Sequence, residues 1–461
     1  MQKQPQAENK MGVMPIPKLI VNMSLPMIVS MLVQAFYNIV DSFFVAKVSE
    51  QSLTAVSLAF PAQNLMIGVA TGTAVGVNAL LSRALGEKNQ SQANSIAEHG
   101  VFLALVGYLV FLLFGLFGVR FFFAAQTDVA EIVDFGVDYL SVICCYSFGV
   151  FGQIMFERLM QSTGRTLYTM FTQGLGAIIN IILDPVFIFV LKQGVRGAAI
   201  ATVIGQIVAF VLAVYLNHTK NPDVQMDIRS CRPRAKIVGR IYAIGVPSII
   251  MVAIGSVMTF AMNKILITYH AARETAATIF GIYFKLNSFV FMPVFGLNNG
   301  IIPIVAFNYG AQNRRRMLQA IKLAVIFVGS YTVCGAIVFM TIPGKLLGIF
   351  NASEIMLQYG EPALRIVGST FIFAGICIAL GSTFQALGFG VYSMIVSLAR
   401  QLVVLVPMAY LLARIGQQTG NNDLVWFSFP IAEIASLVTT LVLYKRLYKN
   451  VILPVPEGSD A

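Results

Sequence analysis

Charged residues are scarce in this 461-residue chain, and so are histidine, cysteine and tryptophan. Only 11% of the residues are Asp, Glu, Lys or Arg, and 57% are hydrophobic, whereas soluble domains carry about 25% charged residues. The apolar residues form long uncharged runs, such as 101–119 and 199–216. Runs of roughly 18 residues or more can cross ~30 Å of hydrocarbon as a helix. The sequence therefore predicts an all-α membrane protein.

The chain also lacks the motifs that enzymes and metal sites need. The three histidines fall at loop or helix-end positions, and neither HExxH nor GxSxG occurs. The absence of GxxxxGK[ST] argues against ATP as the energy source. We expect no enzyme activity, no cofactor and no nucleic-acid partner. The cysteines form no CxxC motif and are expected as buried small residues rather than disulfides; they are Cys144, Cys145, Cys231, Cys334 and Cys377.

Hydrophobic runs predict twelve transmembrane helices. The first 14 residues are polar, no cleavable signal peptide is visible, and the first helix is expected to serve as the insertion signal. The predicted spans are 15–44, 53–82, 92–121, 130–160, 166–190, 195–217, 240–268, 275–305, 315–341, 355–385, 390–414 and 423–447.

The distribution of basic residues predicts the orientation. An even number of spans places both termini on one side of the membrane. Of the 31 Lys and Arg residues we assign 20 to that side, including Arg158 and Arg165, 7 to the opposite side and four to the spans. Because Lys and Arg collect in cytoplasmic loops, both termini are expected in the cytoplasm.

Two halves of the chain resemble one another. Residues 72–76 (GTAVG) match 296–300 (GLNNG), and QSTG at 161–164 matches QALG at 385–388, both at an offset of 224. Each half holds six helices, which predicts two lobes related by a parallel pseudo-two-fold repeat around a central cleft. The expected divisions are an N-terminal lobe (1–217), a cytoplasmic connector (218–239), a C-terminal lobe (240–449) and a cytoplasmic tail (450–461).

Helices 2 and 8 of this prediction carry small residues at four-residue spacing. They are Gly68, Gly72 and Gly76 in the first lobe and Gly296 and Gly300 in the second. Such residues let helices approach closely.

Acidic residues in the predicted spans of the first lobe indicate an ion site. Asp41 lies on helix 1 and Asp184 on helix 5, with no base at comparable depth, and ionisable residues within a membrane are functional by default. Asn180 shares a helix face with Asp184, and Thr202 adds a hydroxyl from helix 6. Oxygen ligands of this kind suit Na⁺, and two close carboxylates suit proton carriage. The sequence leaves both ions open, and purely structural acids as well.

Other polar residues complete the predicted site. Tyr37 and Asn38 share a face with Asp41 on helix 1, where Pro26 is able to bend the helix. The second lobe differs, because Lys264, Lys285 and Arg400 accompany a single acid, Glu433. We expect Glu433 to pair with Lys264 or Lys285, or one of these lysines to line the substrate site.

The chain resembles the multidrug and toxic compound extrusion (MATE) family, and most closely its prokaryotic DNA-damage-inducible branch, which includes a staphylococcal multidrug exporter. The resemblance covers nearly the whole chain. It rests on SLPMIVSMLVQAFYNIVDSFFV (24–45), NIILDPVFIF (180–189), GVRGAAIATVIGQ (194–206) and FKLNSFVFMPVFGLNNGIIPIVAFNYGA (284–311).

This resemblance implies a secondary exporter of cationic, amphipathic drugs, driven by H⁺ or Na⁺, in the cytoplasmic membrane of a prokaryote. It implies cation coupling at Asp41, Asn180, Asp184 and Thr202. It further implies a bend at Pro26 and cargo contacts at Gln153 and Gln161. We expect the transporter to act as a monomer.

Three other readings compete with a drug exporter. A lipid-linked precursor flippase of the same superfamily should line its first-lobe cavity with several arginines, and acids without a base at depth favour cationic cargo instead. A membrane enzyme lacks its motifs. A channel lacks a recognisable filter ring, and the two-fold repeat fits alternating access better.

Overall fold

The computed structural model describes residues 9–227, 232–350 and 352–458, and these residues form helices with no strand among them. Ten of the described helical segments are long and apolar enough to cross a membrane, and two bent helix pairs raise the number to twelve. The all-α, twelve-span prediction is therefore confirmed. Cys231 lies outside the described residues, as do parts of the predicted connector and of both tails.

Helices of the first half follow the predicted spans within a few residues. They are α1 (Lys10–Val13), α2 (Ile16–Ala46), α3 (Glu50–Gly86), α4 (Gln90–Leu113), α5 (Val119–Ala124), α6 (Ala130–Cys145), α7 (Phe148–Ser162), α8 (Thr166–Pro185) and α9 (Gly194–Lys220).

Helices of the second half repeat this pattern. They are α10 (Ala235–Tyr269), α11 (Arg273–Gly310), α12 (Arg314–Thr341), α13 (Pro343–Gly348), α14 (Glu354–Gly368), α15 (Phe371–Ala386), α16 (Gly390–Leu398), α17 (Val406–Thr419) and α18 (Ser428–Leu447).

Two of the predicted spans, 130–160 and 355–385, are bent in the structure. The α6–α7 pair bends by 44° and the α14–α15 pair by 45°. At both breaks a side-chain hydroxyl donates to a backbone carbonyl three residues earlier, from Ser147 to Cys144 (2.8 Å) and from Thr370 to Val367 (2.7 Å). Such bonds compete with the helical ladder. The repeat therefore extends to the position of the bends.

π-helical turns interrupt or end four of the described helices, and two of these turns lie next to a proline. One follows Pro185, over Val186–Val190, and another precedes Pro407, over Ala399–Leu405; the other two span Phe114–Gly118 and Tyr448–Ile452. Proline removes a backbone donor from the helix, and local π turns absorb the mismatch.

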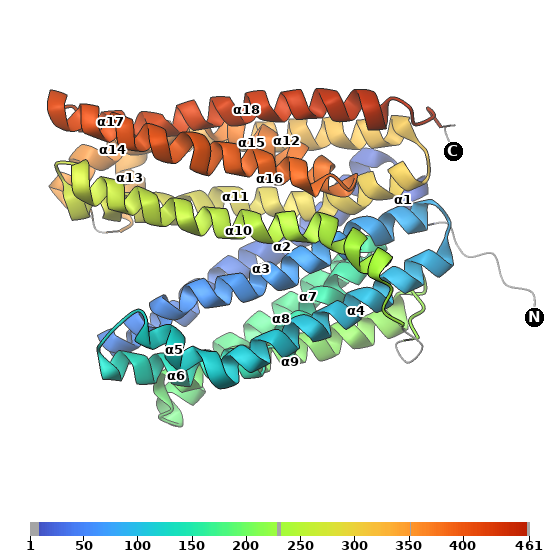
Figure 1. Ribbon diagram of the computed structural model, residues 1–461, viewed down its shortest axis with the longest axis horizontal. Helices are drawn as coiled ribbons and strands as arrows, with labels where there is room; N and C mark the ends of the chain where they lie inside the picture. The colour runs from blue at the N-terminus through green and yellow to red at the C-terminus, as the bar shows by residue number, and fades with distance from the viewer. Residues whose placement is uncertain (1–8, 228–231, 351, 459–461) are drawn as a thin grey trace, which may run out of the picture.

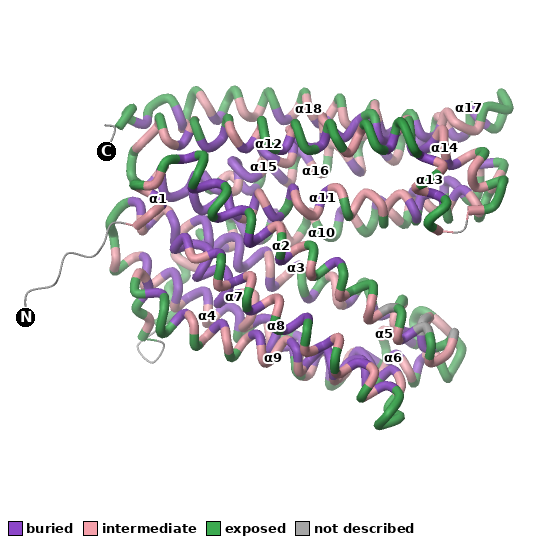
Figure 2. The backbone as a smooth tube through the Cα atoms, turned by 180° about the vertical axis from the view of Figure 1, so that it is seen from behind, coloured by how far each residue is buried: buried purple, intermediate pink, exposed green. Residues whose placement is uncertain are grey.

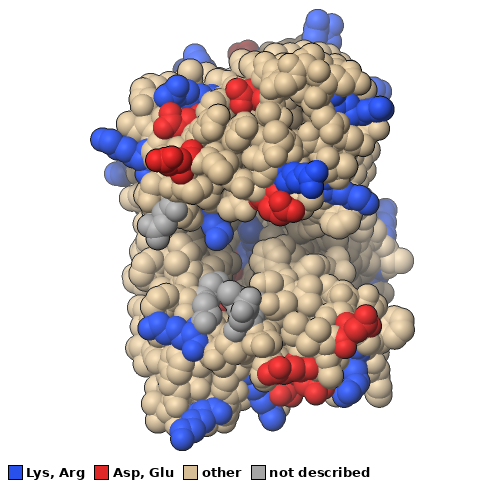
Figure 3. All heavy atoms as spheres, turned by 90° about the vertical axis from the view of Figure 1, so that its left-hand side faces the viewer, with Lys and Arg blue, Asp and Glu red and all other residues tan. Residues whose placement is uncertain are grey.

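The helices form two lobes that meet near the termini and diverge toward the opposite end (Figure 1). Both termini lie at the same end, as twelve spans require. The same separation is visible from behind (Figure 2). Viewed onto the end far from the termini, the surface is hollowed between the lobes (Figure 3).

Close helix packing joins the lobes at the end that carries the termini. A Cβ on Gly72 of α3 would lie 2.8 Å from the carbonyl oxygen of Gly245 on α10. In the other pseudo-equivalent pair, a Cβ on Gly300 of α11 would lie 3.0 Å from the Cα of Ser24 on α2. The small residues predicted on helices 2 and 8 therefore form the contacts between lobes, where each helix backbone packs directly on its partner.

The connector and the N-terminal segment strengthen the same end. His99 lies buried within α4, not at a helix end as expected, and its Nε2 accepts from the backbone N–H of Arg234 just before α10 (2.9 Å). The N-terminal segment is held to the second lobe by Arg316 of α12, whose guanidinium donates to the carbonyl oxygens of Met11 and Met14 (3.1 and 2.6 Å).

The described cysteines are free, as expected. Cys144 and Cys377 are buried, whereas Cys145 is half-buried. Cys334 is exposed, so the prediction of burial is wrong there, because it lies on the outer face of α12.

Replacing Gly72 with Ala tests the contact between lobes. Because the added methyl meets backbone atoms of α10, the helices must separate, and overpacking of this kind costs about 1–3 kcal/mol. We expect a lower Tm for Gly72→Ala in detergent. The matched control is Gly329→Ala on α12, where a Cβ meets nothing within 4 Å, and its Tm should be unchanged or higher. Equal Tm values for the two variants would contradict tight packing at Gly72.

Candidate functional site

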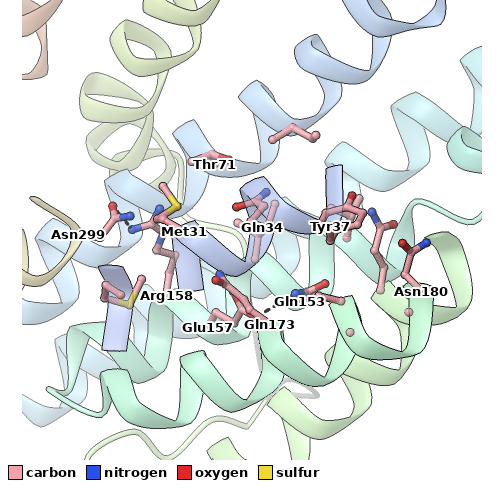
Figure 4. A pocket seen from close by; sticks show the side chains of 18 of the residues that line it. Met31, Gln34, Tyr37, Thr71, Gln153, Glu157, Arg158, Gln173, Asn180 and Asn299 are labelled. Carbon is pink, nitrogen blue, oxygen red and sulfur yellow. Dashed lines mark hydrogen bonds between the residues drawn. The ribbon is translucent and has the colours of Figure 1, made fainter. Parts of the chain in front are cut away.

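A cavity of about 310 Å³ lies inside the first lobe, between α2, α3, α7, α8 and α9. Met27 and Met31 of α2 contribute apolar wall. Asn299 of α11 is the one second-lobe residue among those that line the described cavity. Tyr37 and Asn180 lie at one end and Asn299 and Arg158 at the other, with Glu157 and Gln173 nearer the latter (Figure 4).

The predicted residues of α8 and α9 meet at one end of this cavity. With its amide nitrogen toward Asp184, Asn180 donates to that carboxylate (3.3 Å) and accepts from the hydroxyl of Thr202 (3.2 Å). All three side chains are buried. They are brought together because Gly205 of α9 packs on α8, where a Cβ would lie 2.7 Å from the carbonyl oxygen of Gly176.

Asp41 completes this group from α2. Its carboxylate interacts electrostatically with that of Asp184, and the hydroxyls of Tyr37 and Tyr139 lie within the field of both. One oxygen of Asp41, Oδ1, is buried without a hydrogen-bond partner. An unsatisfied carboxylate oxygen near a second carboxylate can accept a proton or contribute to a shell of oxygens around a cation.

Glu157 and Arg158 form a second buried polar group that the sequence analysis missed. The carboxylate of Glu157 accepts from Gln153 (3.0 Å), Thr172 (2.8 Å) and Gln173 (2.7 Å). Arg158 was assigned to a loop, and that assignment is wrong: its side chain lines the cavity and is buried. We expected the first lobe to contain acids but no base within the membrane. The burial of Arg158 shows that this expectation is wrong.

Residue spacing in α7 contained a signal for Glu157. Gln153, Glu157 and Gln161 recur every four residues, so they share one helix face, and the structure places all three against the cavity. The proximity of Arg158 to the predicted end of the span hid its burial. Because α7 begins only after the bend at Ser147, its direction could not be obtained from the hydrophobic pattern.

The remaining predicted residues lie away from the cavity. Asn38 is exposed on α2, and Pro26 lies within α2, which stays helical on both sides of it. Lys285 is exposed on α11, with its ammonium 5.9 Å from the ring centroid of Phe350. Its side chain is not among those that line the cavity.

Glu433 pairs with a different base from those expected. Its carboxylate accepts from Arg400 at 3.2 Å, and neither Lys264 nor Lys285 forms an ion pair with it. Arg400 lies in the π-helical turn before Pro407, and its guanidinium reaches Glu433 on α18 from there. Neither residue of the pair lines the first-lobe cavity.

Comparison with known proteins identifies the family. The family model described as MatE matches residues 26–186 and 247–411, which is more than half of the chain and falls within both lobes. The chain belongs to the MATE family of transporters.

Individual proteins of the MATE family match over nearly the full length. "Multidrug export protein MepA" of Staphylococcus aureus (strain bovine RF122 / ET3-1) is 26% identical over 442 residues, which cover 93% of this chain and 94% of the relative. A solved structure of "MATE in the straight conformation" has a TM-score of 0.90 at 24% identity, covering 97% of this chain and 99% of that one.

Another similar structure shows the "outward-facing conformation of a multidrug resistance MATE family transporter of the MOP superfamily", with a TM-score of 0.88 at 24% identity. It covers 97% of this chain and 100% of that chain. The two-lobe arrangement of the MATE fold is thus present here.

Breaking the second-lobe ion pair should destabilise the protein. Arg400→Gln leaves the buried carboxylate of Glu433 without its cation, a loss of about 1–3 kcal/mol. We expect a lower Tm in detergent, while Lys264→Gln, which removes an exposed cation on α10, should leave Tm unchanged. A Tm for Arg400→Gln equal to that of wild type would contradict a stabilising pair.

Proposed function

We propose that this MATE transporter exports cationic, amphipathic compounds in exchange for H⁺ or Na⁺. One observation carries the proposal: a single first-lobe cavity has Glu157 in its wall and, at one end, Asn180, which hydrogen-bonds Asp184. A carboxylate in a largely apolar cavity is suited to an organic cation. The similarity to proteins named as multidrug exporters supports the same function.

The positions of the three acids suggest separate roles in cargo binding and ion coupling. Glu157 lines the cavity, whereas Asp41 and Asp184 are absent from its lining, and Asp184 is reached through its hydrogen bond with Asn180. We assign cargo binding to Glu157 and ion coupling to Asp41, Asn180, Asp184 and Thr202. A coupling ion at Asp184 alters the hydrogen bonds of Asn180, which connects ion and cargo within one lobe.

The lobe arrangement supports alternating access. The lobes are joined by close contacts at the end with the termini, and the surface is hollowed between them at the opposite end (Figure 3). We propose that both termini are cytoplasmic in a prokaryotic cell membrane, which makes this form open to the outside. Rocking about the cavity then exposes cargo and coupling ion to alternate sides. The proposed working unit is a monomer.

A lipid-linked precursor flippase remains the second candidate. Arg158 in the cavity wall is the kind of residue that an anionic pyrophosphate needs. It is the one Lys or Arg among the residues that line the described cavity, and Glu157 accompanies it. One base beside an acid supports a drug exporter better than a lipid pyrophosphate flippase.

Transport of ethidium, a permanent cation, tests the proposed function. Two assays are run on proteoliposomes, one without sodium under a pH gradient and one under a sodium gradient. Wild-type protein should export the dye in at least one of them. Asp41→Asn and Asp184→Asn should lower gradient-driven transport at least about tenfold, because each removes a carboxylate from the coupling site. Glu157→Gln should weaken dye binding by a similar factor.

Asp138→Asn is the control, since this exposed acid on α6 lies outside the cavity; its transport should match wild type. If wild-type protein transports the dye under the sodium gradient but not under the pH gradient, Na⁺ is the coupling ion. No wild-type transport under either gradient would overturn the drug-exporter proposal and favour the flippase.

Reporter fusions test the orientation. Green fluorescent protein fused after residue 461 should fluoresce in a bacterial host, and alkaline phosphatase at the same place should be inactive, because both readouts require a cytoplasmic C-terminus. Phosphatase inserted between α5 and α6, at the opposite end, should be active. The reverse pattern would contradict the proposed orientation.

A further inference from the structure

Arg158 is a buried cation that forms no direct ion pair, although the adjacent Glu157 attracts it through space. Its side chain is 8% exposed, and Nη1 donates to the side-chain oxygens of Gln161 and Asn299, both at 2.9 Å. Both acceptors are neutral, and no Asp or Glu in the described chain forms an ion pair with this guanidinium. A buried charge without a directly hydrogen-bonded opposite charge is unfavourable, so a ligand that brings a carboxylate to Arg158 would gain a charged hydrogen bond there.

The neighbouring acid, Glu157, attracts Arg158 electrostatically but does not hydrogen-bond to it. Glu157 and Arg158 are consecutive on α7, and adjacent residues on a helix point in different directions. Each oxygen of Glu157 is held by neutral donors instead, Oε1 by Gln153 and Thr172 and Oε2 by Gln173. The cavity wall therefore contains one acidic and one basic side chain, Glu157 and Arg158. Each is hydrogen-bonded to amides or hydroxyls and not to the other (Figure 4).

The space around these two charges matches a compound of drug size. Its volume of about 310 Å³ lies in the range of small-molecule sites. Apolar wall from Met27, Met31 and Ile67 accompanies the charged groups. A ligand with an ammonium, a carboxylate and an apolar frame would satisfy Glu157 and Arg158 together.

We propose that Arg158 is an anion subsite and that the cavity prefers zwitterionic cargo, with a carboxylate at Arg158 and an ammonium at Glu157. This inference rests on the proposed export function and specifies its cargo. A guanidinium binds a carboxylate through two parallel hydrogen bonds. Gln161 and Asn299 occupy Nη1 alone, which leaves donors for the cargo.

Binding of a matched pair of probes tests the subsite. Norfloxacin is zwitterionic near pH 7, and its methyl ester keeps the ammonium and the fluorescent ring system but loses the carboxylate. With purified full-length protein in nanodiscs and no gradient, wild type should bind the acid at least about tenfold more tightly than the ester, since a charged hydrogen-bond pair is lost.

Variants separate the subsite from structural effects. Arg158→Gln should weaken binding of the acid at least about tenfold and change that of the ester less than about threefold. Arg158→Lys keeps the positive charge but loses the two parallel donors of the guanidinium, so its affinity for the acid should lie between those of wild type and Arg158→Gln. Glu157→Gln should weaken both probes equally and so preserve their ratio. Asn299→Ala removes the bond between lobes but keeps the guanidinium, and should also preserve the ratio.

Equal wild-type affinities for acid and ester would overturn the inference, and this comparison needs no variant to fold. Equal weakening of both probes by Arg158→Gln, matched by Asn299→Ala, would also overturn it, because it would make Arg158 a structural contact only. Ethidium export reports the proposed function separately. A preserved acid preference without dye export would leave the subsite standing and overturn export of simple cations.

Discussion

Direct backbone contact between the two lobes is the constraint on which the remaining structure depends. Gly72 on α3 and Gly300 on α11 let these helices lie against α10 and α2 without intervening side chains. Association of helices in lipid depends on such packing, because lipid tails are as apolar as the helices themselves. The lobes are held together at one end only, so they diverge beyond it. A cavity within one lobe can then face the space between them.

The two lobes repeat the same helices but differ in their polar interior. In the first lobe the polar groups line a cavity, whereas a buried carboxylate oxygen without a hydrogen-bond partner occurs in both lobes, on Asp41 and on Glu433. In the second lobe the ion pair of Arg400 and Glu433 joins two helices away from that cavity. Equivalent prolines, Pro185 and Pro407, adjoin π-helical turns in both. The same order of helices thus carries a polar cavity in the first lobe and a buried ion pair in the second.

Much of the ion site was predictable, whereas half of the cavity was not. Asn180 and Asp184 lie four residues apart on one helix, and the bond between them follows from helical geometry alone. Arg158 was misplaced because it lies close to the end of a span, where the hydrophobic pattern locates a boundary only within a few residues. Its acceptor Asn299 is 141 residues away in the other lobe, and no local pattern links the two.

Composition and hydrophobic runs by themselves determined that this chain crosses the membrane twelve times, because length and apolarity are properties of each segment alone, and matches at an offset of 224 residues added the two similar halves. Spaced motifs added the MATE resemblance and the acids of the first lobe. Only the tertiary structure decided that α7 turns inward after its bend and places Glu157 and Arg158 in the cavity, and that Arg400 pairs with Glu433. These outcomes depend on the angles between packed helices, which no single segment encodes.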